Sequence, residues 1–367
     1  MSGLGGGSGG SGGAGLDRVP VIAVHTDFIA DIAETHFEGG SAALATNHLA
    51  TLRTGGIDCI CEHVIGDTFE ALCFPTRAIH QATGAGQRYP PSSLKHALRL
   101  LVALLVDVEQ SSGDFVVATT AAEIRSAAAR GRIAVVLCFQ GLTPCEGDPD
   151  MLAVFHRLGL RIAGITTNTD NAAGRSQLGR GGGLTGIGKA LVRRAHELRM
   201  LIDVSHLSDQ GIADVLDIVG GPVIASNSNT RHHHDIPRNL SDDMLRAIAA
   251  SGGVVGVHAN GDLITSERPV TLDHLADHVC HIVDLVGIDH AAIGPDLVDD
   301  SMYPARRYRE IMAGKAHFSA PYPEGLRDHG DLPALTAVLA RRGFADADLR
   351  QITGGNALRV FEAAWGA

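Results

Sequence analysis

Positive charge is scarce in this sequence and is not gathered into a cluster. The 367 residues include 30 Lys and Arg against 41 Asp and Glu, which gives a net charge of −11 and a sequence pI near 5.9. Nucleic acids and anionic membrane surfaces attract clusters of basic residues. We therefore expect neither as a main partner. The 45% hydrophobic content indicates a globular protein with a substantial core.

A secretion signal and a long apolar run are also missing. Residues 1–15, MSGLGGGSGGSGGAG, form a flexible Gly/Ser leader without the basic start or apolar stretch of a signal peptide. The longest apolar helix candidate, Leu94–Val108, is interrupted by basic residues, so it is unsuited to span a bilayer. We expect no membrane segment, and one domain over residues 16–367.

The cysteines lack the spacing of a disulfide framework. Without a secretion signal, reduced thiols and a cytoplasmic location are expected. Cys59 and Cys61 alternate along an apolar run, which favours strand packing over a metal clip. The six cysteines are Cys59, Cys61, Cys73, Cys138, Cys145 and Cys280.

Short apolar runs alternate with helical stretches along the chain. Eight such runs predict a parallel (β/α)₈ barrel, completed by helices near Leu332–Arg342 and Asp346–Phe361. The runs are Val21–Val24, Ile57–Cys61, Ile133–Phe139, Ile162–Thr166, Leu201–Val204, Pro222–Ala225, Val254–Val257 and Ala291–Ile293. Other predicted helices are Ser41–Thr54, Ser92–Gln110, Thr120–Gly131, Asp150–Leu158, Lys189–Arg199 and one that begins at Ser241.

Polar side chains follow these runs at the point where each ends. In MLIDVSHLSD, residues 200–209, an apolar run leads to His206 and then to a helix start. The carboxyl ends of barrel strands meet at one face, where active sites form. We therefore expect one cavity around His206. It is lined by His25, Asp27, Gln140, Thr167, Asn168, Asn227, His258 and Asp296.

Four of these residues have the chemistry of a metal site. His25 and Asp27, two positions apart on an extended chain, project to the same side. With His206 and Asp296 they form a set of two imidazoles and two carboxylates that suits Zn²⁺ or Fe²⁺. The sequence predicts one divalent cation here.

Three further residues are candidates for acid–base catalysis or for extra ligation. Glu62 and His63 end the second run and His258 ends the seventh, and both ends face the same cavity in a barrel. For His63 and His258 the alternative is a buried histidine satisfied by the backbone.

Two other patterns invite a functional interpretation. The string from Arg231 to Asp235, RHHHD, has a surface-like composition that needs no metal to explain it. The Gly-rich segment Gly179–Gly188 does not follow a strand, which favours a loop leading into a helix over a phosphate cradle.

These motifs together resemble the membrane (renal) dipeptidase family, zinc peptidases built on a (β/α)₈ barrel. The similarity spans nearly everything after the leader, in matching order and spacing, and it also implies a homodimer. The motifs are HTDF at 25–28, GLR at 159–161, GLTGIGKALV at 183–192, MLIDVSHLSD at 200–209, PVIASNSN at 222–229, PRNLSDDMLRAIAASGGVVGV at 237–257, GIDHAAIGPD at 287–296 and GGNALRVFE at 354–362.

The resemblance implies a binuclear zinc site, of which only part is present. His25, Asp27 and His206 match family ligands, but the bridging Glu position holds Gln140 and the second His position holds Asn227. Two cations about 3.5–4 Å apart need a bridging anion to offset their repulsion. A neutral amide does not supply one, so we expect a mononuclear site.

The resemblance also implies how a substrate is held. Arg238 matches the arginine that binds the substrate carboxylate, and Asp296 matches the acid that handles the proton. Thr167, next to Asn168, stands where the family has a histidine that assists at the scissile carbonyl. With Gln140 and Asn227, these residues are the predicted substrate-binding set.

Three functions are compatible with this pattern. The first is a metal-dependent hydrolase that cleaves an amide in a small amino-acid-derived or dipeptide-like substrate. The second is a lyase, isomerase or cyclising enzyme on the same scaffold, favoured by the changes at Gln140, Thr167 and Asn227. The third is a catalytically silent binding protein.

Overall fold

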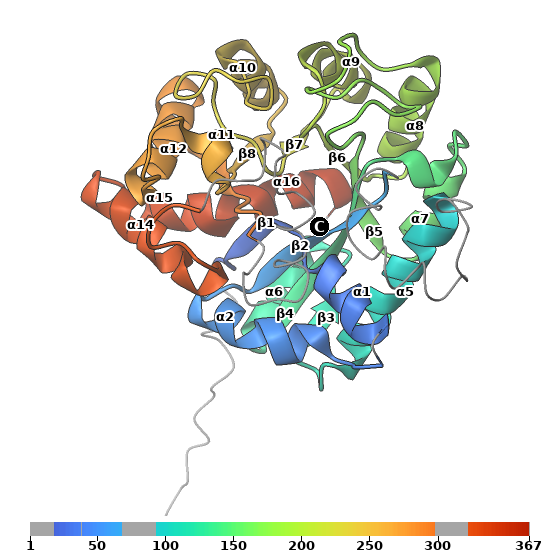
Figure 1. The fold of residues 1–367 in the computed structure, drawn as a ribbon, viewed down its shortest axis with the longest axis horizontal. Helices are drawn as coiled ribbons and strands as arrows, with labels where there is room; N and C mark the ends of the chain where they lie inside the picture. The colour runs from blue at the N-terminus through green and yellow to red at the C-terminus, as the bar shows by residue number, and fades with distance from the viewer. Residues whose placement is uncertain (1–17, 38, 68–92, 298–321, 367) are drawn as a thin grey trace, which may run out of the picture.

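Parallel strands arranged as a nearly closed barrel form the centre of the molecule (Figure 1). The computed structural model describes residues 18–37, 39–67, 93–297 and 322–366. The predicted (β/α)₈ architecture is confirmed: strands pair in the order β1-β2-β4-β5-β6-β7-β8-β9, and β9 lies against β1. Their bounds are β1 Ile22–Thr26, β2 Cys59–Ile65, β4 Ile133–Gln140, β5 Leu160–Gly164, β6 Leu201–Asp203, β7 Ile224–Ala225, β8 Val254–Val257 and β9 Ala291–Ile293. A short strand that was not predicted, β3 (Phe115–Val117), pairs with β4 outside the ring.

Helices surround the strands, and most of the predicted helices are present. The bounds are α1 Ile29–Phe37, α2 Leu49–Thr54, α5 Ser93–Gln110, α6 Ala121–Ala129, α7 Met151–Arg157, α8 Gly186–Glu197, α9 Asp209–Val219, α10 Asp242–Ala250, α11 Gly261–Ile264, α12 Leu272–Val286, α14 Leu332–Arg341, α15 Asp346–Arg350 and α16 Asn356–Trp365. Ser241 caps α10, as predicted, by accepting a hydrogen bond from Met244 N. The predicted helix over 41–54 begins later, with a π-helical turn at Leu44–His48 before α2.

Alternation along the strands separates the barrel interior from the layer under the helices. In β4, Ala134, Val136 and Cys138 face the interior, whereas Val135 and Leu137 pack against the helices. This period of two follows from the pleat of a β-strand. The same alternation directs the side chain of Gln140, the last residue of β4, toward the barrel interior.

An irregularity in β1 redirects one site residue. Ala23 pairs with Ile60 and Thr26 with Glu62, so β1 contains one extra residue between these pairs. Such a bulge rotates the following side chains relative to the pleat. Without it His25 would share the outward direction of Ala23; instead its ring stacks on His63 with centroids 3.7 Å apart.

Helix α16 closes the opposite end of the barrel. Figure 1 shows it across the middle of the ring of strands. Its residues Ala357, Leu358, Val360 and Phe361 are buried in one cluster with Ile22 and the other inward residues at the strand starts. A packed lower end leaves the carboxyl ends of the strands as the face on which a cavity forms.

Two sequence expectations concern membranes and thiols. Across the described residues, every helix is too short or too polar to cross a membrane. Cys59, Cys61, Cys138, Cys145 and Cys280 are free thiols. Cys59 and Cys61 are both buried in the barrel interior, as strand packing predicts. The leader and Cys73 lie outside the described residues.

We expect Gly294→Ala to destabilise the barrel. An added Cβ would meet Ser226 O at 1.6 Å and Val24 Cγ2 at 3.1 Å, so the backbone must shift. Overpacking of this kind costs about 1–3 kcal/mol or more, measured as the free energy of unfolding in urea. Gly186→Ala is the control, because nothing lies within 4 Å of its added Cβ. An unfolding free energy equal for both variants would contradict the close approach.

Candidate metal centre at the carboxyl ends of the strands

Three of the four predicted metal ligands converge at the end of β1. His25 Nε2 lies 3.6 Å from Asp27 Oδ1 and 3.9 Å from Asp296 Oδ2. One ligand atom from each residue lies within 4.8 Å of the others. Asp27 Oδ1 is buried without a hydrogen-bond partner. An unpartnered buried carboxylate oxygen beside an imidazole nitrogen fits a divalent cation.

A chain of hydrogen bonds behind His25 orients its ring. His25 Nδ1 lies 2.7 Å from Ser226 Oγ, and that hydroxyl donates to the buried carboxylate of Asp203. Asp203 also accepts from Ser205 N at 2.9 Å and Ser226 N at 3.1 Å. With Nδ1–H donating to Ser226, Nε2 keeps its lone pair toward Asp27 and Asp296. Such a second layer fixes the tautomer of a ligating histidine.

Asp203 was missed from the sequence. It lies inside the apolar run of β6, two residues after Leu201, and alternation places both toward the barrel interior. Although burial alone raises the pKa of Asp203, the neighbouring His63 and the Ser226 hydroxyl bring it below its usual value. A charged residue with inward parity in a buried strand was the available signal.

The carboxyls of Asp27 and Asp296 are electrostatically unlike. Burial, and then the charge of Asp296, raise the pKa of Asp27 well above its usual value. Burial also acts to raise the pKa of Asp296, but His25 and His258 together hold it well below its usual value. Asp27 is therefore the carboxyl of the pair that holds a proton more readily, as expected for close carboxylates. A bound cation would replace it.

A second group, His25, His63 and Asp203, also has ligand atoms within 4.8 Å of one another. It fits a cation less well. Both Asp203 oxygens already accept hydrogen bonds from residues 205 and 226. His63 donates from Nδ1 to Cys61 O at 3.0 Å, and its Nε2 lies 3.6 Å from Asp203 Oδ2. This group instead supports the ring of His25.

His206, the fourth predicted ligand, belongs to neither group. Its Nδ1 lies 2.9 Å from Asn168 Oδ1, so Nε2 is the acceptor nitrogen. Arg238 Nη2 lies 2.9 Å and Gln140 Nε2 lies 3.0 Å from that nitrogen. Burial, followed by the charge of Arg238, lowers the pKa of His206 well below its usual value. A guanidinium thus occupies the side of His206 that a cation would need.

Asn227 lies between the candidate metal ligands and Arg238. Its Nδ2 donates to Asp296 Oδ2 at 2.9 Å and lies 3.3 Å from His25 Nε2. Its Oδ1 accepts from Arg238 at 2.7 Å. The same side chain therefore joins the candidate ligands to the arginine, as a neutral spacer. Gln140 adds a second neutral amide, whose Oε1 is buried without a hydrogen-bond partner.

The candidate acid–base residues take different positions. His258 Nδ1 accepts from Asn260 N at 3.1 Å, and its Nε2 lies 3.1 Å from Asp296 Oδ2. Glu62 faces the other way, because it alternates with the inward Cys61 and His63. Both its oxygens are engaged, by Thr26 Oγ1 at 2.6 Å and Ile29 N at 2.6 Å. Glu62 thus anchors the turn between β1 and α1.

The remaining predicted substrate-binding residue, Thr167, is held by a buried carboxylate that was also missed. Asp67 Oδ2 accepts from Thr167 N at 3.0 Å and from Thr167 Oγ1 at 3.2 Å. Asn171 Nδ2 donates to both Asp67 oxygens at 3.1 Å. These bonds fix the loop after β5 beside His206. Asp67 follows β2 after Gly66, where no motif marks it.

Carboxylate and imidazole side chains at the carboxyl ends of the strands of a parallel barrel are typical of metal-binding (β/α)₈ enzymes. The family model for membrane dipeptidase, peptidase family M19, matches residues 16–314 and 313–365. The chain belongs to this family, and the resemblance in the sequence is confirmed.

Individual relatives agree with this assignment. Dipeptidase verJ of Clonostachys rogersoniana is 30% identical over 273 residues, 74% of this chain and 65% of that protein. Dipeptidase ataJ of Aspergillus terreus is 26% identical over 371 residues, 95% of this chain and 85% of that protein. The alignments with the first three curated relatives span only 53% to 65% of those proteins' lengths.

Solved structures share the fold. The structure of dipeptidase AC, a metallopeptidase, superposes with a TM-score of 0.76 at 25% identity, covering 96% of this chain and 100% of that one. A Rhodobacter sphaeroides metallopeptidase, liganded with a phosphinate mimic of L-Ala-D-Ala, gives a TM-score of 0.78 at 24% identity, covering 95% and 100%.

We expect Asp27→Asn to remove one equivalent of metal. The amide has the size of the carboxylate but lacks its charge, which a divalent cation needs. Metal per chain is measured by elemental analysis on protein purified without chelator, against the unsubstituted chain. Thr265→Ala is the control, since Thr265 Oγ1 accepts from Glu267 N outside the cavity. Equal metal content in Asp27→Asn and the unsubstituted chain would contradict the site.

Proposed function

We propose that this protein is a metal-dependent hydrolase of the dipeptidase type, cleaving an amide bond in a small amino-acid-derived substrate. The observation that carries the proposal is the group of His25, Asp27 and Asp296, with an unpartnered oxygen on Asp27. We propose one divalent cation there, Zn²⁺ or Fe²⁺, in keeping with one imidazole and two carboxylates.

The surroundings of His206 support a single cation rather than two. Gln140 and Asn227 contribute no negative charge, and Arg238 brings a permanent positive charge to 2.9 Å from His206 Nε2. A second dication here would repel both the guanidinium and the first cation, without a bridging anion between them. The arginine supplies in part the positive charge that a second cation would contribute.

The residues divide the chemistry among them. A cation bound at the His25 group supplies Lewis-acid polarisation of a carbonyl and activation of water. The Asp296 carboxylate accepts a proton, and His258 Nε2, 3.1 Å from Asp296 Oδ2, positions that carboxylate. The planar, positively charged guanidinium of Arg238 matches the geometry of a carboxylate. Arg238 therefore binds the carboxylate of an amino-acid substrate. The buried Gln140 Oε1 is an acceptor for a substrate ammonium or amide group.

The substrate class rests on similarity and on charge. Several curated relatives are named dipeptidases, and a solved relative holds a dipeptide mimic. A cavity that pairs a buried guanidinium with carboxylates suits a zwitterionic amino-acid derivative. We extend the proposal to a cytoplasmic homodimer; the free thiols support the location and the family resemblance supports the dimer.

A second function is favoured by one observation. The position of the second cation is filled by two amides and a guanidinium, all hydrogen-bonded to each other or to His206. This arrangement keeps the carboxylate anchor while it changes the hydrolytic apparatus. A lyase, isomerase or cyclising reaction on an amino-acid-like compound is the alternative on this scaffold.

We expect Asp296→Asn to lower kcat/KM for dipeptide hydrolysis by about 10²–10⁴-fold, the usual contribution of a general acid or base. A panel of dipeptides is assayed after reconstitution with Zn²⁺ or Fe²⁺. Asp243→Asn is the control, because Asp243 is exposed on α10 and pairs there with the exposed Arg246 at 3.1 Å. Dipeptide hydrolysis that survives complete removal of metal would contradict the proposed hydrolase.

We expect the double substitution Gln140→Glu with Asn227→His to add a second metal equivalent. It supplies the anion and the imidazole that two cations need, and the charged Glu also gives Arg238 a new partner. Elemental analysis and dipeptide turnover are measured together. A second equivalent with higher turnover supports a peptidase scaffold; a second equivalent without turnover favours the non-hydrolytic alternative.

A further inference from the structure

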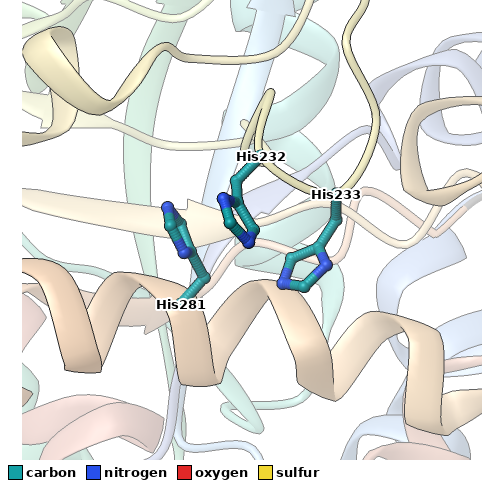
Figure 2. Close-up of side chains that lie close together, drawn as sticks. All are labelled: His232, His233 and His281. Atoms are coloured by element: carbon teal, nitrogen blue, oxygen red, sulfur yellow. The ribbon is translucent and has the colours of Figure 1, made fainter.

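Three histidines meet on the surface, away from the barrel cavity. His232 and His233 come from the loop between β7 and α10, and His281 comes from α12 (Figure 2). One ring nitrogen of each lies within 4.8 Å of the others. We propose that these three residues bind a second, distinct cation of the Zn²⁺, Ni²⁺ or Cu²⁺ class, which ties this loop to α12.

The ring arrangement is compact. The rings of His232 and His281 stack with centroids 4.1 Å apart and an interplanar angle of 11°. His233 stands nearly perpendicular to both, with centroids 4.9 Å from His232 and 5.7 Å from His281. The three ring nitrogens lie within 4.8 Å of one another. We expect the side chains to rotate so that each nitrogen reaches the roughly 2.0–2.1 Å bond of an imidazole–metal site.

A buried histidine one turn before His281 fixes the loop in place. His278 Nδ1 accepts from Thr230 N at 3.1 Å, and its Nε2 lies 2.9 Å from Ile264 O. Thr230 precedes His232 by two residues, so the first two ligands start from an anchored backbone. The ring of His233 also packs on His278, with centroids 5.2 Å apart. The site is therefore organised before any cation arrives.

A carboxylate orients the third histidine. His281 Nε2 lies 2.8 Å from Asp242 Oδ1, at the first turn of α10. Ligating histidines commonly direct one ring nitrogen to a carboxylate, which sets the tautomer and strengthens the other nitrogen as a ligand.

The local charge and the donor type favour a transition-metal cation. Arg231, the nearest basic residue in the string, is paired with Asp209 at 2.7 and 2.8 Å. The donor set consists of nitrogen alone, which selects borderline transition metals over Mg²⁺ and Ca²⁺.

The location links this surface to the cavity. In this loop, His232 and His233 lie between Asn227 and Arg238, two residues of the candidate site. A cation that fastens the loop to α12 restricts the segment between them. The surface site is thus a brace for the part of the barrel that positions the arginine.

The test is isothermal titration with NiCl₂ at pH 7.5, on full-length protein stripped of metal. We expect the unsubstituted chain to bind one more equivalent than His281→Ala, or to bind it at least ten-fold more tightly. The double variant His232→Ala with His233→Ala should lose the same equivalent, and both of its positions are exposed, so folding is preserved. His196→Ala, an exposed histidine on α8, is the control and should bind as the unsubstituted chain does.

Two results would overturn the proposal. One is equal stoichiometry and affinity in the unsubstituted chain, His281→Ala and the double variant. The other is a loss in His196→Ala as large as that in His281→Ala, which would mean unspecific binding to surface histidines. Since Asp27 and Asp296 remain intact in all these chains, failure here leaves the barrel site untouched.

Discussion

The buried carboxylate of Asp203 is the interaction on which the candidate site depends. It collects two backbone N–H groups and the Ser226 hydroxyl, and through that hydroxyl it sets the tautomer of His25. The direction of the Nε2 lone pair that His25 presents to Asp27 and Asp296 is therefore set by a residue of β6, a strand that does not pair with β1. A buried charge is tolerable only when its hydrogen bonds are complete, and completing them is what holds β6, β7 and β1 in one geometry.

Strand ends were predictable from the sequence, whereas side-chain direction was not. The apolar runs located the strands and brought His25, Asp27 and Asp296 to one face, because parallel strands share a carboxyl end. Alternation then distinguishes Glu62 from His63, and the bulge in β1 reverses it for His25. A bulge depends on pairing with a neighbouring strand, so a single run of sequence does not reveal it.

The helices missed from the sequence have a physical reason as well. Helix α12 spans Leu272–Val286 and carries three aspartates and three histidines among its apolar residues, with the histidines at 274, 278 and 281. Their spacing of four and three residues is helical. No helix was predicted over this stretch. The contact between His281 and His232 arises because α12 packs beside the β7–α10 loop, which the local sequence does not reveal. Asp67 was missed likewise, because its partners lie about 76–104 residues away.

Helix α16 gives the barrel an order of assembly. The interior residues at the amino ends of β1 and its neighbours are covered by Ala357, Leu358, Val360 and Phe361 of α16. Until that helix has left the ribosome, the first strand to be made has no lid, and its apolar interior faces water or a chaperone. Folding of the central sheet is thus tied to a helix that follows all its strands in the chain, and the apolar strand starts are exposed to aggregation until that helix has been made.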